Sequence, residues 1–162
     1  MSNNLWATPP YAYEYWNKRA PFSADMCANA FNKKHNIYFT VKNDSLSFNW
    51  AEKVKGYDPN AVWVWCNPPY SDPLPWVQKA IEASEDGLGV MMLVKTDKST
   101  KWFMEAWNYG VTVFDVMGGR IQFVEPNGTK ASSNNFCSTY LHFHGHQSAS
   151  KVIHIDYLKG KV

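Results

Sequence analysis

The chain has 162 residues, of which 45% are hydrophobic and 19% are charged, and its formal net charge is +2. This balance predicts a single soluble globular domain over residues 1–162, and it excludes both a disordered chain and a dedicated, strongly basic nucleic-acid binder. No apolar run is long enough to cross a membrane. The scattered cysteines, Cys27, Cys66 and Cys137, form neither a disulfide framework nor a zinc motif. We therefore expect a cytoplasmic protein with no membrane partner and no metal.

The first half of the chain alternates helical and extended patterns. After an extended start that contains two prolines, a short helix is expected over Tyr11–Lys18. The apolar stretch Pro21–Cys27 contains an acid near its end, and Ile37–Val41 has the β-branched and aromatic content of a strand. The polar segment Lys53–Asn60 is predicted to be a loop.

The second half predicts two fully buried strands, each followed by a helix. The strands Ala61–Cys66 and Gly89–Val94 are too short for helices and apolar on both faces. The helices are expected from Pro73 to about Glu85 and over Thr100–Tyr109. Three more strand candidates follow: Val111–Val116, Arg120–Val124 and Phe136–Phe143. This order predicts an α/β fold whose sheet is mostly parallel, with an antiparallel hairpin near its C-terminal end.

The tetrapeptide Asn67-Pro68-Pro69-Tyr70 directly follows the first buried strand. Two consecutive prolines lack N–H groups and fix φ, so the backbone leaves the sheet along one rigid path. The path presents an amide, a proline carbonyl and a phenol ring, which together offer two hydrogen-bond acceptors and a flat stacking surface. These groups suit the edge of a nucleobase that carries an amino group, although Asn-Pro-Pro could also be an ordinary loop opener.

Polar residues also follow the other predicted strands, at Asp25, at Asp44 and over Lys95–Asp97. In a parallel sheet, ligands bind beyond the carboxyl ends of the strands, so these residues are expected around one crevice. Either acid could instead cap a helix or a turn.

An ordered series of motifs over about residues 5–125 resembles the phage-type DNA N-6-adenine methyltransferases. The motifs are Trp6-Ala7-Thr8-Pro9, Phe22-x-x-Asp25-x-Cys27-Ala28, Asn32 through Tyr38-Phe39-Thr40, Asp44-x-Leu46, Trp65-Cys66-Asn67-Pro68-Pro69-Tyr70-Ser71, Trp76-Val77-x-Lys79-Ala80, Leu93, Thr96-Asp97-x-x-x-Lys101-Trp102-Phe103 and Gly119-Arg120-Ile121-x-Phe123. The resemblance implies a three-layer, Rossmann-like class I methyltransferase fold without a separate target-recognition domain. It also implies a phage or prophage origin, action in the host cytoplasm and a possible role in protecting DNA from host nucleases in restriction–modification.

The resemblance further implies that S-adenosylmethionine is the methyl donor and S-adenosylhomocysteine the product. By motif position, the residues expected at the cofactor are Trp6, Thr8, Pro9, Asp25, Cys27, Ala28, Asp44 and Asn67. The residues expected to act in catalysis are Asn67, Pro68, Pro69 and Tyr70.

The expected reaction is methylation of the exocyclic N6 of adenine in DNA. Acceptors at the Asn67 side chain and the Pro68 carbonyl would hold the amine hydrogens, and Tyr70 would stack on the flipped base. Asn67 replaces the aspartate frequent in adenine methyltransferases. The same acceptor geometry also suits cytosine N4, a base in RNA or a protein glutamine, and a catalytically inactive DNA-binding relative is a further alternative.

DNA is the expected partner, and a chain of this size could pair as a homodimer to reach enough of it. The DNA contacts are expected from lysines that follow Val94 and from the polar loop 125–135. The candidates are Lys95, Lys98, Lys101, Asn127, Lys130 and Asn134. His142, His144 and His146 alternate as they would on one face of a strand, but no acidic or cysteine ligand stands nearby in sequence, so a metal site is not predicted there.

Overall fold

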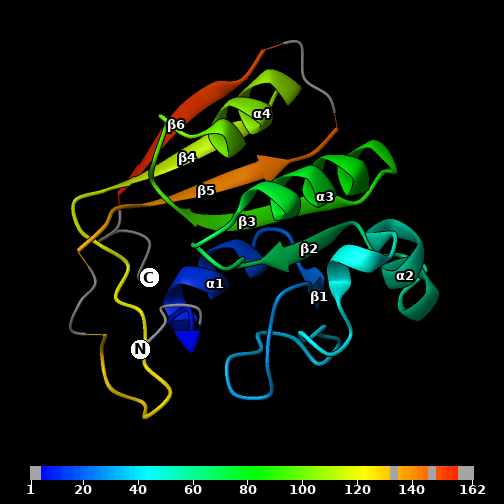
Figure 1. The fold of residues 1–162 in the computed structure, drawn as a ribbon, viewed down its shortest axis with the longest axis horizontal. Helices are drawn as coiled ribbons and strands as arrows, with labels where there is room; N and C mark the ends of the chain where they lie inside the picture. The colour runs from blue at the N-terminus through cyan, green and yellow to red at the C-terminus, as the bar shows by residue number, and fades with distance from the viewer. Residues whose placement is uncertain (1–4, 132–134, 146–148, 157–162) are drawn as a thin grey trace.

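In the computed structural model of the chain, helices cover both faces of a central β-sheet (Figure 1). The structure describes residues 5–131, 135–145 and 149–156. Within this part, the strands of the sheet lie in the order β1-β2-β3-β5-β4-β6. They are β1 (Phe22–Asp25), β2 (Trp63–Cys66), β3 (Gly89–Lys95), β4 (Thr112–Met117), β5 (Ser138–Phe143) and β6 (Lys151–Asp156).

The sheet is parallel except at β5. Strands β1, β2 and β3 pair in parallel, and so do β4 and β6. β5 pairs antiparallel with β3 on one side and with β4 on the other. The predicted α/β class and mostly parallel sheet are therefore confirmed. The predicted antiparallel pairing near the C-terminal end is confirmed by β4 and β5, although β5 lies inside the sheet and the parallel strand β6 forms its edge.

In the part of the chain that the structure describes, three α-helices pack on one face of the sheet and one α-helix packs on the other. The first face carries α2 (Trp50–Tyr57), α3 (Leu74–Glu85) and α4 (Lys101–Tyr109), and the opposite face carries α1 (Pro10–Asn17). Beside α1, that second face is covered by irregular segments, which bring Trp6, Ile121 and Phe123 into its core. Many of the aromatic residues are used here as packing: Tyr13 lies edge-on to Trp65, with ring centroids 5.4 Å apart.

Local sequence explains the helix positions. Asn49 precedes α2 and accepts a hydrogen bond from the Glu52 amide at 2.9 Å, and Thr100 caps α4 in the same way through the Phe103 amide. The four helices and strands predicted between residues 61 and 109 are confirmed within a few residues of their expected ends.

Four segments differ from the sequence-based prediction. Helix α2 occupies most of the segment predicted as a polar loop, since Trp50, Ala51 and Val54 form a buried helical stripe and only the opposite side is polar. Ile37–Val41 is not a strand, because it pairs with β1 only at an isolated bridge between Asp25 and Tyr38, where β1 ends.

Arg120–Val124 is not a strand either, although Ile121 and Phe123 are buried in alternation as a strand would bury them. Val124 pairs with single residues, Ala7 and Lys130, so no ladder forms. Strand β6 was missed, because its short apolar run lies between Lys151 and Asp156 and is largely exposed.

Among the described residues, no helix combines the length and the apolar character that a membrane span requires.

Candidate active site

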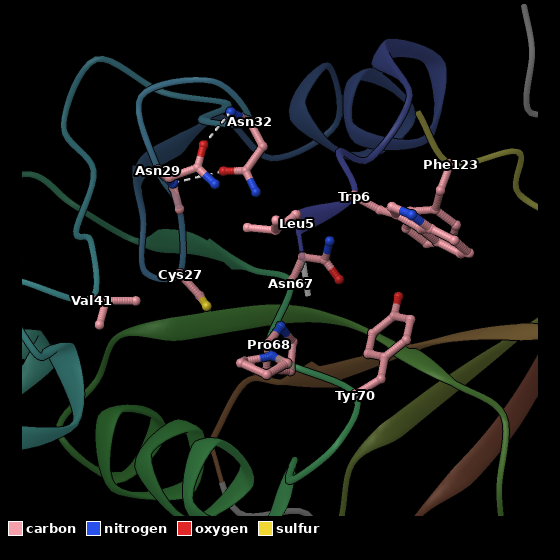
Figure 2. A pocket seen from close by; sticks show the side chains of 12 residues that line it. Leu5, Trp6, Cys27, Asn29, Asn32, Val41, Asn67, Pro68, Tyr70 and Phe123 are labelled. Carbon is pink, nitrogen blue, oxygen red and sulfur yellow. Dashed lines mark hydrogen bonds between the residues drawn. The ribbon is translucent and has the colours of Figure 1, made fainter. Parts of the chain in front are cut away.

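A cavity of about 200 Å³ lies beyond the C-terminal ends of β1 and β2. The turn after β1 contributes Cys27 and Ala28, and the segment after β2 contributes the whole of Asn67–Tyr70. Trp6, from the N-terminal segment, and Phe123 form the aromatic side of its wall (Figure 2). Residues from segments far apart in sequence thus meet where a parallel sheet is expected to bind its ligand.

Among the described residues, one hydrogen bond holds the Asn67 side chain. Its Nδ2 donates to Thr8 Oγ1 at 3.1 Å, and Thr8 itself is only 2% exposed. Asn67 Oδ1 is buried and accepts no hydrogen bond from any described residue. A buried acceptor without a hydrogen bond lowers the stability of the folded protein. A ligand in the cavity that donates a hydrogen bond to this oxygen would remove that cost.

Tyr70 presents a second unpaired polar atom. Its hydroxyl is buried and has no partner among the described residues, and burial raises the pKa of the phenol well above its usual value. The ring lies edge-on to Phe123 and Phe136, at centroid distances of 6.0 and 5.5 Å. Figure 2 shows this hydroxyl and the Asn67 amide oxygen pointing toward the same space below Trp6 and Phe123.

Asp25 organises the turn that follows β1. Its carboxylate accepts hydrogen bonds from the Cys27 amide at 3.2 Å and from the Lys34 amide at 2.9 Å. Burial nevertheless raises the pKa of Asp25 to about 7, because desolvation outweighs these two bonds. Burial also raises the pKa of Cys27 to about 12, and that of Cys66 well above its usual value, so neither thiol is a ready nucleophile.

A second cavity, of about 140 Å³, adjoins the first. The two share Cys27, Ala28, Val41 and Pro69 in their walls. Asp44 lies in the wall of the second cavity with a φ of 47°, a left-handed conformation that aspartate tolerates better than most residues do. No described residue donates a hydrogen bond to its carboxylate, so this group is available to a ligand.

Most of the predicted site residues meet here. Trp6, Cys27, Ala28 and Asn67–Tyr70 line the first cavity, and Asp44 lines the second. The remaining candidates, Thr8, Pro9 and Asp25, do not form its wall: they are buried behind it. Asn29 and Asn32 also line the first cavity. Asn32 belongs to the motif series, but neither asparagine was predicted as a site residue. Their three-residue spacing, typical of a side-chain-capped turn, was the available signal.

The match to known proteins covers nearly the whole chain. Residues 1–158 match the family described as DNA N-6-adenine-methyltransferase (Dam). The chain belongs to the Dam family. It is 33% identical over 138 residues to a DNA N-6-adenine-methyltransferase of Haemophilus phage HP1, with 82% of this chain and 73% of that protein covered. It is 30% identical over 147 residues to one of Escherichia phage T1, where 82% of this chain and 58% of the phage protein are covered. The family resemblance noted from the motifs is confirmed.

In this Dam-family chain, the lysines predicted at DNA differ in their surroundings. Lys95 is exposed at the end of β3, with its ammonium group 5.9 Å from the centre of the Phe136 ring. By contrast, Lys98 pairs with Asp115 at 2.8 Å and Lys101 lies 3.8 Å from Glu105. The positive charge at these two positions is therefore partly neutralised within the fold.

The predicted polar loop is built around a tight turn. Asn127 accepts hydrogen bonds from the amide and the hydroxyl of Thr129, so its side-chain oxygen is already used within the loop. Lys130 is exposed, and its backbone forms an isolated antiparallel β-bridge with Val124. Asn134 lies outside the described residues.

The histidines at the C-terminal end of β5, His142 within the strand and His144 just after it, are packed among neighbours. His142 stacks on Trp63 with ring centroids 4.4 Å apart, and His144 Nε2 lies 3.2 Å from Thr112 Oγ1. His146 lies outside the described residues, and the described part of the chain contains no cluster of three or more metal-ligating side chains.

Proposed function

We propose that this chain is an S-adenosylmethionine-dependent methyltransferase that acts on the N6 amine of adenine in DNA. The proposal rests on membership of the Dam family and on the names of its two phage relatives. The six-stranded sheet with helices on both faces is compatible with the class I methyltransferase fold that the motif resemblance implies.

The observation that carries the proposal is the unpaired Asn67 Oδ1 in a cavity walled by aromatic rings. The exocyclic amine of adenine is a poor nucleophile, because its lone pair is delocalised into the ring. An acceptor that holds an amine hydrogen favours the pyramidal, nucleophilic form of that nitrogen. Asn67 Oδ1 supplies one such acceptor and the Pro68 carbonyl is proposed as the other.

Tyr70 and its aromatic neighbours suit a base that has left the duplex. A flipped adenine loses its stacking partners, and base–aromatic stacking restores about 1–3 kcal/mol per base. Tyr70 provides the ring next to the acceptors, and its buried hydroxyl provides a donor that no described residue uses.

The paired cavities fit a long, bipartite cofactor such as S-adenosylmethionine. The unpaired carboxylate of Asp44 suits the ribose hydroxyls of an adenosyl group, and the second cavity also offers the aromatic side chains of Phe39 and Trp76. The first cavity, with the turn at Cys27 and Ala28, would hold the methionyl part close to Asn67. When bound, the cofactor supplies an electrophilic methyl group on a sulfonium.

Two measurements test the proposal. Titration calorimetry should detect S-adenosylmethionine binding that is lost when the paired cavities are blocked by Ala28→Trp. Nucleoside analysis of DNA from a bacterium without its own adenine methyltransferase should show N6-methyladenine when this chain is expressed. N6-methyladenine should be absent when Asn67→Ala is expressed at the same level, and its absence in both strains would contradict the proposal.

A further inference from the structure

The loop Ala28–Asn43, called here the basic loop, connects β1 to the second cavity and borders the mouth of the first. Residues 26–43 include Lys33, Lys34 and Lys42 but no aspartate or glutamate. Lys33 and Lys42 are exposed, and no ion pair within the described residues involves a lysine of this loop. Within that part of the chain, the lysines of the basic loop thus lack the ion pairs that partly neutralise Lys98 and Lys101.

A hydrogen-bonded turn gives the basic loop a defined shape at the cavity. Asn32 Oδ1 accepts from the Asn29 amide at 2.7 Å. In return, Asn29 Oδ1 accepts from the amides of Phe31 and Asn32, at 2.8 and 2.9 Å. Figure 2 shows this reciprocal pair beside the cavity, whose wall includes both asparagines. Phe31 belongs to this turn and lies in sequence between Asn29 and Asn32, which are both in the cavity wall.

Two large apolar side chains of the cavity wall are exposed, and so is Phe31, which precedes the wall residue Asn32 in sequence. Phe31 is 50% exposed, and the cavity-lining residues Leu5 and Val41 are 48% and 95% exposed. Large apolar groups are costly to leave in water, and an apolar patch bordered by charges marks an interaction site. Apolar groups flanked by cations complement a base stack flanked by phosphates.

We propose that the basic loop is a contact surface for duplex DNA around the extruded base. Lys33 and Lys42 bind phosphates on either side of the extruded base. Phe31 packs against the neighbouring bases, which lose a stacking partner when the target base leaves the duplex. The proposal rests on the proposed function for the identity of the flipped base, but its charge argument requires only that the chain binds DNA.

The charge argument is tested by the salt dependence of binding to a labelled duplex of random sequence. Each phosphate contact contributes about 0.9 to the slope of log K against log salt. The double variant Lys33→Gln/Lys42→Gln should therefore reduce the magnitude of the slope by about 2. The matched variant Lys18→Gln/Lys151→Gln, at exposed lysines after α1 and in β6, should leave the slope near the wild-type value. An unchanged slope in the loop variant, an equal loss in both variants, or no salt-dependent binding by the wild type would each overturn the proposal.

The role of Phe31 is tested by methyl transfer under conditions where the DNA is either duplex or denatured to single strands. Phe31→Ala should lower transfer to duplex about tenfold, with a smaller effect on single strands and unchanged cofactor affinity. Tyr57→Ala, which removes a similarly exposed aromatic ring from α2, is the control and should have no effect. Equal losses on both kinds of DNA would reject the role given to Phe31.

The two assays separate the proposals. A wild-type chain that binds duplex with the expected slope, yet transfers no methyl group, would contradict the enzymatic function and leave the contact surface standing.

Discussion

Asn67 Nδ2 donates a hydrogen bond of 3.1 Å to the buried hydroxyl of Thr8. The two residues are far apart in sequence, and this contact holds the amide group of Asn67 in one orientation at the cavity. With the nitrogen committed to Thr8, the oxygen is left as an unpaired acceptor. We therefore predict that Thr8 acts by orienting Asn67, a role distinct from the cofactor contact that the motif resemblance implies.

Replacing Thr8 by valine should lower kcat about tenfold, because the amide loses the bond that orients it and a typical hydrogen bond contributes about 0.5–1.5 kcal/mol. The Kd for S-adenosylmethionine should stay near the wild-type value, and Thr8→Ser should restore kcat. A weakened Kd with unchanged kcat would instead indicate that Thr8 serves the cofactor.

Asn67→Ala should lower kcat by about 100-fold or more, a loss typical of removing one preorganised hydrogen-bonding group from an active site. Asn67→Asp is the matched control, since it keeps an oxygen acceptor and Thr8 can donate to it, and it should retain measurable transfer. Steady-state kinetics with calorimetry of cofactor binding distinguishes this result from misfolding, which would abolish both.

Tyr70→Phe should keep most activity and leave the free energy of unfolding equal or higher by about 1 kcal/mol, because it removes a buried hydroxyl without a partner. Tyr70→Ala should destabilise the fold by about 3 kcal/mol, as packing against Phe123 and Phe136 is lost, and should lower transfer severely. Denaturant unfolding and kinetics of both variants test this. Equal catalytic damage from both would assign the function to the hydroxyl.

The buried carboxyl of Asp25 predicts a pH dependence of stability. Its folded pKa of about 7 lies above that of an unfolded aspartate, near 4. Between these values the folded state binds the proton and the unfolded state does not, so this group lowers stability as pH rises from about 4 to about 7. His142 acts in the opposite direction between about pH 4 and 6.5, because burial lowers its folded pKa to about 4.

Urea unfolding of wild type and Asp25→Asn at several pH values isolates the Asp25 contribution. The difference in unfolding free energy between wild type and Asp25→Asn should change by at most about 1.4 kcal/mol per pH unit between about pH 4 and pH 7, and it should level off above pH 7. Parallel curves for the two proteins would show that Asp25 titrates normally.

Asp44→Asn should raise the Kd for S-adenosylmethionine about tenfold or more, since a hydrogen bond to a charged group contributes about 1.5–3 kcal/mol. Asparagine tolerates the left-handed backbone at this position, so the substitution tests the charge without adding strain. Glu85→Gln, an exposed change at the end of α3, is the control. Unchanged affinity would remove Asp44 from the cofactor site.

Local patterns were sufficient to predict much of the fold. The strands β2 and β3 and the helices α3 and α4 have apolar runs, caps and glycines that determine them within a few residues. Helix α2 was missed because its polar face dominates its composition, and Ile37–Val41 was overpredicted because strand propensity does not reveal whether a partner is available.

The candidate site also has a part that local sequence predicts and a part that it does not. The rigid path of Asn67–Tyr70 follows from two prolines, so its place beyond β2 was predictable. The contact between Asn67 and Thr8, and the meeting of Tyr70 with Phe123 and Phe136, depend on tertiary packing that no local pattern encodes.

The central claim is most directly tested by transfer of a labelled methyl group from S-adenosylmethionine to unmethylated duplex DNA, with the purified wild-type chain and Asn67→Ala assayed side by side. The account predicts label in N6-methyladenine for the wild type alone. Label in another nucleoside, or no label despite measurable cofactor binding, would contradict it.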